Sequence, residues 1–105
     1  MIIGYMRNAK EPTNLAKLTA LSCKEKGIEL LYIRPSDIDI ENSKVTGHIF
    51  SEDHWKLVET DIPEFIDVTP YCFKRKNKKV MDFLIDCTTL SYEPLKYNLY
   101  KDTEI

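Results

Sequence analysis

The chain has 105 residues, of which 43% are hydrophobic and 30% are charged. This length and balance predict one globular α/β domain over residues 1–105, with a modest core and no signature of disorder. The formal net charge of −2 argues against general affinity for nucleic acids or anionic membranes.

The N-terminal sequence lacks the basic segment, long apolar segment and cleavage site of a signal peptide, so we expect a cytoplasmic protein. No apolar run has the length of a membrane-spanning helix. The three cysteines, Cys23, Cys72 and Cys87, are odd in number and far apart. They predict reduced thiols rather than a disulfide framework or a zinc site, and no metal site is expected.

The first elements in chain order form a predicted β-α-β unit. Ile2-Ile3-Gly4 is a short apolar strand, and Pro12-Thr13-Asn14 is a helix-start signal because Thr or Asn can cap exposed N–H groups. A helix is predicted from Leu15 to Lys26, followed by Gly27 at the left-handed position beyond its end. The nearly continuous apolar run Ile28–Ile33 predicts a strand covered on both faces. The two strands should be parallel, with a right-handed crossover.

The predicted helix is amphipathic. Its apolar positions Leu15, Leu18 and Leu21 lie along one stripe. Small residues flank this stripe, and most charged residues lie elsewhere on the helix. The flanking small residues are Ala16, Ala20 and Cys23, and the charged residues are Lys17, Lys24, Glu25 and Lys26.

The second half of the chain predicts a hairpin, a further core strand and a helix. Pro35-Ser36 ends the second strand, and an acidic connector follows over residues 37–42. The hairpin comprises Val45–Phe50 and Trp55–Thr60, joined by a four-residue loop, Ser51–His54. Phe65–Thr69 is the third core strand, and a helix runs from about Lys78 to Cys87. The expected architecture is therefore a small three-layer-like domain: a parallel β-α-β core, a β-hairpin and a C-terminal helix.

Polar residues follow each of the three predicted core strands. In an open parallel sheet, ligands bind beyond the carboxyl ends of the strands, and guanidinium groups there can receive a carboxylate or phosphate. The predicted substrate-binding residues are Arg7, Asn8, Arg34, Ser36, Thr69 and Tyr71. The alternative interpretation is that Arg7 and Arg34 are loop arginines paired with Glu11 or Asp37.

A basic run precedes the last predicted helix and is a second candidate site. Its cationic residues are Lys74, Arg75, Lys76, Lys78 and Lys79. Clustered cations can bind a phosphate-rich partner, although such a run is more often a solvated turn. No aromatic residues are interleaved as a stacking platform, so nucleic acid binding is disfavoured. Neither Cys72 nor Cys87 has a histidine nearby in sequence, and no catalytic residue is assigned.

The opening Gly4-Tyr5-Met6-Arg7-Asn8-Ala9 resembles the start of serine recombinase catalytic domains, which run Gly-Tyr-x-Arg-Val-Ser. The resemblance covers only the first strand and turn. Ala9 holds the position of the nucleophilic serine, so strand cleavage by that mechanism is not expected, and the resemblance is disfavoured.

The order of elements along the whole chain resembles the N-terminal, pre-ATP-grasp domain of ATP-grasp ligases, particularly the group associated with bacterial spore coats. The matching features are the β-α-β start, the strand end Tyr32-Ile33-Arg34-Pro35, the hairpin, the segment Ile62–Tyr71 and the helix that follows. The nucleotide-binding lysines and magnesium-binding carboxylates of that family have no matching positions here. The resemblance therefore implies a substrate-binding and scaffolding domain that is not catalytic alone, with ATP and magnesium bound only by a larger parent ligase.

Two other classes of function stay open. The first is a small non-enzymatic binding or oligomerisation module, in which a homodimer covers exposed sheet edges. The second is a nucleic-acid module that uses the basic run. The expected partner in the leading hypothesis is a small carboxylate or phosphate ligand, and no membrane partner is expected.

Overall fold

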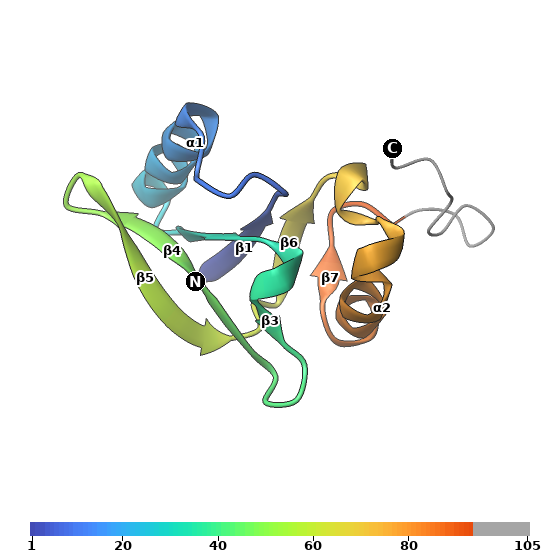
Figure 1. The fold of residues 1–105 in the computed structure, drawn as a ribbon. Coiled ribbons are helices and arrows are strands. Elements are labelled where there is room, and N and C mark those ends of the chain that lie inside the picture. The colour runs from blue at the N-terminus through green and yellow to red at the C-terminus, as the bar shows by residue number, and fades with distance from the viewer. Residues whose placement is uncertain (94–105) are drawn as a thin grey trace.

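A computed structural model describes residues 1–93, which form a mixed sheet with one helix on each face (Figure 1). The elements are β1 (Ile2–Met6), α1 (Asn14–Glu25), β2 (Glu29–Ile33), β3 (Ile38–Asp39), β4 (Lys44–Ser51), β5 (His54–Asp61), β6 (Phe65–Val68), α2 (Lys78–Cys87) and β7 (Thr89–Leu90). Short 3₁₀ turns lie at Pro35–Asp37, Pro70–Cys72 and Arg75–Asn77. The α/β prediction is confirmed.

Within residues 1–93 the sheet has seven strands in the order β3-β4-β2-β1-β6-β7, and β5 pairs with β4. β1 is parallel to β2 and β6, and β6 is parallel to β7. β4 runs antiparallel to β2, β3 and β5. The parallel β1-α1-β2 unit was predicted from sequence and is confirmed.

The two helices cover opposite faces because side chains alternate along the central strands. Met6, Leu31 and Ile33 point toward the core under α2, where Met81 and Leu84 are fully buried. On the other face, α1 packs over aromatic and aliphatic side chains of the sheet. This second cluster contains Tyr5, Ala16, Ala20, Leu30, Tyr32 and Phe50.

The ends of α1 follow the predicted capping signals. The Thr13 side chain accepts a hydrogen bond from the Ala16 N–H at 3.2 Å. At the other end Gly27 has a φ of +76°, and its N–H donates to the Lys24 carbonyl while the Ile28 N–H donates to the Cys23 carbonyl. These two bonds form a Schellman motif, which ends the helix and directs the chain into β2.

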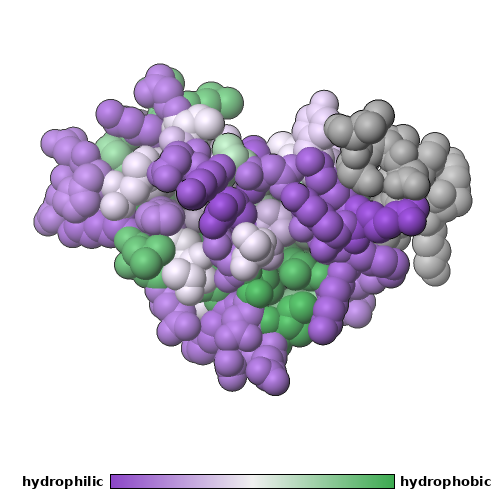
Figure 2. Space-filling model, in the orientation of Figure 1, coloured by the Kyte–Doolittle hydropathy of each residue, from purple (hydrophilic) through white to green (hydrophobic). Residues whose placement is uncertain are grey.

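The predicted amphipathic stripe of α1 does not face the sheet. Leu15, Leu18 and Leu21 are 66%, 55% and 40% exposed, whereas Ala16 and Ala20 are buried. Figure 2 shows hydrophobic residues at the surface over α1. The reason lies in the sheet, whose face under α1 carries bulky residues such as Tyr5, Tyr32 and Phe50. Small side chains let the helix approach these rings closely, so shape overrides the hydrophobicity of the stripe.

The β4–β5 hairpin is longer and its loop shorter than predicted. Ser51 pairs with His54, so the loop is the two residues Glu52 and Asp53 rather than the expected four. Their φ angles are +52° and +68°, which is the type I′ turn that suits the twist of paired strands. The usual Asn-Gly signal is absent from this turn. Beside the turn, Lys56 forms an ion pair with Glu52 at 2.8 Å.

Two short strands were not predicted. The acidic connector contains β3, where Ile38 is buried opposite Val45 of β4. β7 follows α2 directly and places Leu90 beside Ile66 of β6. α2 has the predicted bounds. Of the tyrosine-rich segment Ser91–Ile105, the part from residue 94 onward lies outside the described residues. Among residues 1–93, no helix is long and apolar enough to cross a membrane.

Candidate functional site

The carboxyl ends of β1, β2 and β6 lie side by side at one edge of the sheet, as predicted. β1 and β2 stay paired to their ends, where the Arg7 N–H donates to the Ile33 carbonyl at 3.0 Å. The chain leaves this edge through three turns, and between them lies a hollow of about 410 Å³. Its lining residues are Asn8, Arg34, Pro35, Ser36, Lys74, Lys76 and Asn77.

This hollow joins two sites that the sequence predicted separately. Asn8, Arg34 and Ser36 come from the predicted substrate-binding set, and Lys74 and Lys76 come from the basic run. The remaining predicted residues lie outside the lining. They are Arg7, Thr69 and Tyr71 of the first set, and Arg75, Lys78 and Lys79 of the second. Pro35 and Asn77 also line the hollow. Neither was predicted as a site residue, although each lies between residues that were.

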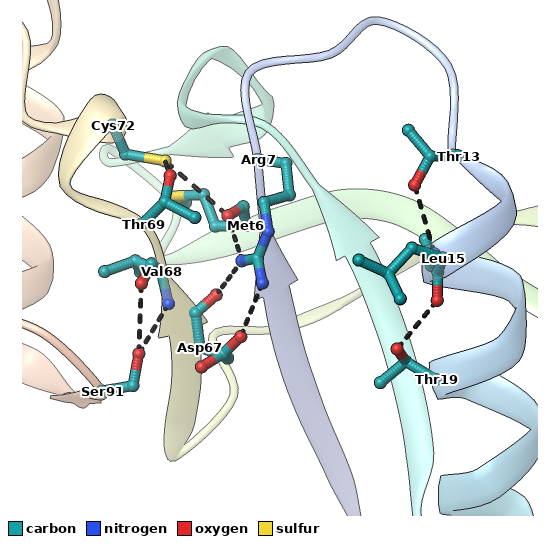
Figure 3. Close-up of polar contacts among 11 residues, drawn as sticks. Met6, Arg7, Thr13, Leu15, Thr19, Asp67, Val68, Thr69, Cys72 and Ser91 are labelled. Carbon is teal, nitrogen blue, oxygen red and sulfur yellow. Dashed lines mark hydrogen bonds and ion pairs between the residues drawn. The ribbon is translucent and has the colours of Figure 1, made fainter.

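Arg7 makes its contacts within the sheet and does not line the hollow. Its guanidinium forms an ion pair with Asp67 of β6 at 2.8 Å and also donates to the carbonyls of Met6 and Asp67 at 2.7 and 3.0 Å (Figure 3). The guanidinium carbon lies 3.8 Å from the centre of the Tyr5 ring, a cation–π contact. The expected alternative was a pair with Glu11, but Arg7 instead links β1 to the neighbouring strand β6.

Thr69 and Tyr71 also have local structural contacts. The Thr69 hydroxyl lies 3.8 Å from the sulfur of Cys72, which is fully buried and lies 3.7 Å from the Met6 carbonyl (Figure 3). Burial raises the pKa of the Cys72 thiol, so the sulfur stays protonated near neutral pH. Tyr71 turns outward and is 74% exposed, while its carbonyl accepts a hydrogen bond from the Asn8 amide at 2.8 Å.

Arg34 is held at the rim of the hollow by the turn that follows β2. Its backbone N–H donates to the Asp37 carboxylate at 2.9 Å, and its guanidinium lies 3.6 Å from the other carboxylate oxygen. The expected Arg34–Asp37 pair is therefore present. The Arg34 side chain remains 35% exposed. A guanidinium has five N–H donors in a planar fork, so Asp37 positions the group without using all of its donors.

The opposite wall of the hollow supplies two lysines and one amide. Within residues 1–93 neither Lys74 nor Lys76 is ion-paired, whereas Lys78 of the same run pairs with Asp82 at 2.7 Å. The Asn77 amide donates to the Cys72 carbonyl at 2.9 Å, which fixes the turn that presents both lysines. The basic run is thus divided: part of it enters the hollow, and part of it stabilises the start of α2.

Tyr32 anchors the loop that carries Asn8. Its hydroxyl donates to the Ala9 carbonyl at 2.7 Å, and the Glu11 carbonyl lies 3.3 Å away. The ring is buried between Tyr5 and Trp55, with centroids 6.2 and 6.1 Å away. Burial raises the pKa of Tyr32, partly offset by the nearby guanidinium groups of Arg34 and Arg7. The neutral phenol is therefore the stable form, and it keeps donating to the loop.

Another hollow, of about 390 Å³, lies at the opposite end of the strands. Its lining is mainly apolar and includes Ile2, Ile62 and Phe65, and its two carboxylates belong to Asp61 and Glu64. It offers no cationic side chain. Among residues 1–93, no group of three or more His, Cys, Asp or Glu side chains is arranged to hold a metal ion.

Comparison with protein-family models finds no matching family, and comparison with curated proteins finds no matching sequence. The chemistry of the hollow is therefore the main guide to function. Three cationic side chains, two amides and a hydroxyl surround it, and among the lining residues there is no carboxylate. This donor set suits an anion with several oxygen atoms.

Proposed function

We propose that the chain binds a small anionic molecule, a phosphate or carboxylate compound, in the hollow at the carboxyl edge of the parallel strands. The observation that carries this proposal is the convergence of Arg34, Lys74 and Lys76 on one 410 Å³ space. The three cations come from two segments about forty residues apart in sequence, so their meeting depends on the fold.

The three cations have different roles in this proposal. Asp37 holds Arg34 in position, and the Arg34 guanidinium provides a planar fork for two anion oxygens. Lys74 and Lys76 act as point charges that raise the local concentration of anions. Asn8 and Ser36 supply neutral donors and acceptors, which can distinguish one anionic molecule from another.

The biological role that we propose is that of a substrate-binding and scaffolding domain of an ATP-grasp-type ligase. The support is the order of elements, a β-α-β unit followed by a hairpin, a parallel strand and a helix, together with the hollow at the expected edge. In this role the domain holds an acceptor substrate, and the ATP-binding lobes of a ligase perform the reaction. The 105-residue chain should therefore show no ATP hydrolysis, and robust turnover by it would contradict this role.

Anion binding is tested by calorimetric titration with inorganic phosphate and, separately, with malonate as a carboxylate probe. We expect Lys76→Gln to weaken binding by about tenfold, because it removes one charge-assisted contact. Lys79→Gln is the matched control, since Lys79 belongs to the same basic run but lies outside the hollow. Equal losses in the two variants would indicate a diffuse effect of net charge and would contradict a specific site.

A further inference from the structure

The hollow at the carboxyl edge has room for more than a single anionic group. Its volume of about 410 Å³ lies within the range of small-molecule sites, roughly 300–1,000 Å³, and inorganic phosphate fills only part of such a space. The neutral polar side chains of the lining are Asn8, Ser36 and Asn77. Their unused hydrogen-bonding atoms indicate what the rest of the ligand carries.

The side-chain oxygen of Asn8 is not used by the protein. The side-chain nitrogen donates to the Tyr71 carbonyl at 2.8 Å. A backbone carbonyl can only accept, so this bond determines which end of the amide is the nitrogen. Within residues 1–93 the Asn8 Oδ1 accepts no hydrogen bond. Asn8 therefore has one acceptor oxygen and one further N–H for a ligand.

Asn77 has the same arrangement on the other wall of the hollow. Its side-chain nitrogen donates to the Cys72 carbonyl at 2.9 Å, which again identifies the two ends of the amide. Asn77 stands directly before α2, yet its side chain does not cap that helix. In the described part of the chain its Oδ1 also accepts no hydrogen bond. The lining thus combines cations with two acceptor oxygens.

The charge of the hollow limits which donors can reach these oxygens. Arg34, Lys74 and Lys76 line the same space, and among the lining residues there is no carboxylate. Asp37 offsets the charge of Arg34, which leaves the two lysines. A ligand ammonium would be repelled there, so the donors must be neutral. A hydroxyl group fits, because it can donate to an amide oxygen and also accept from an N–H or from the Ser36 hydroxyl.

We propose that the ligand is a hydroxylated anion, a phosphorylated or carboxylated polyol. Its anionic group contacts the cations, and its hydroxyl groups donate to Oδ1 of Asn8 and of Asn77. This inference rests on the proposed anion binding and adds the chemical class of the ligand. It also makes Asn8 a residue that determines specificity.

Calorimetric titration at pH 8 with glycerol 1-phosphate and propyl phosphate tests the ligand class. The two compounds differ only in two hydroxyl groups, and both are dianions at this pH. We expect glycerol 1-phosphate to bind roughly fivefold more tightly, because its hydroxyl groups add neutral hydrogen bonds. 3-Aminopropyl phosphate should bind more weakly than propyl phosphate. Glycerate and propionate give the same comparison for a carboxylate, and the pair that binds more tightly identifies the anionic group.

Asn8→Ala tests the role of the asparagine. The loop stays anchored in this variant, because the Tyr32 hydroxyl donates to the Ala9 carbonyl at 2.7 Å. We expect the advantage of glycerol 1-phosphate over propyl phosphate to fall by about threefold. Asn42→Ala is the matched control, since Asn42 is also exposed and donates its amide to Asp39, but it lies outside the hollow. It should leave the advantage unchanged.

The outcomes separate this inference from anion binding itself. Lys76→Gln should weaken both phosphate compounds by the same factor, because both carry the anionic group. Equal affinities within both pairs of compounds, or an advantage that Asn8→Ala leaves intact, would overturn the inference, while anion binding would stand. Tighter binding of 3-aminopropyl phosphate than of propyl phosphate would also overturn it. If none of the anions binds, the proposed function fails, and the inference fails with it.

Discussion

At the scale of single residues, two arginines that look equivalent in sequence have different environments. Arg7 and Arg34 each follow a core strand. Arg7 is drawn toward Asp67 and the Tyr5 ring, whereas Arg34 is fixed at the rim of the hollow by Asp37. The position of Asp67, on a strand sixty residues away, decides which arginine is structural. The spacing of residues along the sequence does not show that Asp67 lies beside Arg7.

Replacing the two arginines should separate stability from binding. Arg7→Gln should lower the free energy of unfolding by about 1–2 kcal/mol, because an ion pair and two carbonyl contacts are lost at a partly exposed position. Its phosphate affinity should stay within about twofold of wild type, because only local contacts change. Arg34→Gln should do the reverse and weaken phosphate binding by about tenfold. Urea denaturation and calorimetry measure the two quantities, and a large loss of affinity in Arg7→Gln would contradict the assignment.

Tyr32 gives a prediction that depends on pH. Tyr32→Phe removes the donor to the Ala9 carbonyl and should cost about 1 kcal/mol of stability at pH 7. Because burial raises the folded-state pKa above the ordinary value of 10.0, the stability from the neutral phenol is fully present below pH 10. It is lost as the pH rises through the folded-state pKa. The difference in unfolding free energy between wild type and variant should therefore shrink above pH 10, and a difference that grows there would contradict this account.

At the scale of elements, sequence patterns predicted the type and position of the helices and strands better than the face that a helix buries. The caps of α1, the parallel β1–β2 pair and the bounds of α2 were all predicted, because each depends on local signals and on alternation within one segment. The buried face of α1 was not, because it depends on the bulk of Tyr5, Tyr32 and Phe50 beneath the helix. Likewise the two-residue turn Glu52-Asp53 lacks the glycine that usually marks it.

The orientation of α1 can be tested with one substitution on each face. Leu18→Gln should change the free energy of unfolding by less than about 0.5 kcal/mol, because the side chain is largely exposed. Ala16→Leu should destabilise by about 1–3 kcal/mol, because it overpacks a fully buried position against the sheet. Thermal and urea unfolding supply both values. A larger cost for Leu18→Gln than for Ala16→Leu would mean that the helix is turned the other way.

At the scale of the whole molecule, the fold combines residues that the sequence presents as unrelated sets. The edge rule for parallel sheets predicted Asn8, Arg34 and Ser36 as neighbours, and the hollow brings them together. The same rule gave no indication that Lys74 and Lys76 complete the wall. The position of the two lysines depends on the two 3₁₀ turns after β6, Pro70–Cys72 and Arg75–Asn77. Neither Pro70 nor the basic run indicates from sequence alone how these turns direct the chain.

Mapping of backbone amide shifts by nuclear magnetic resonance during a phosphate titration tests the central proposal most directly. We expect saturable shifts concentrated at residues 7–8, 34–37 and 74–77, which lie in or beside the lining of the hollow. Shifts that spread evenly over lysine-rich surfaces, or that centre on the apolar hollow at the other end of the strands, would contradict it.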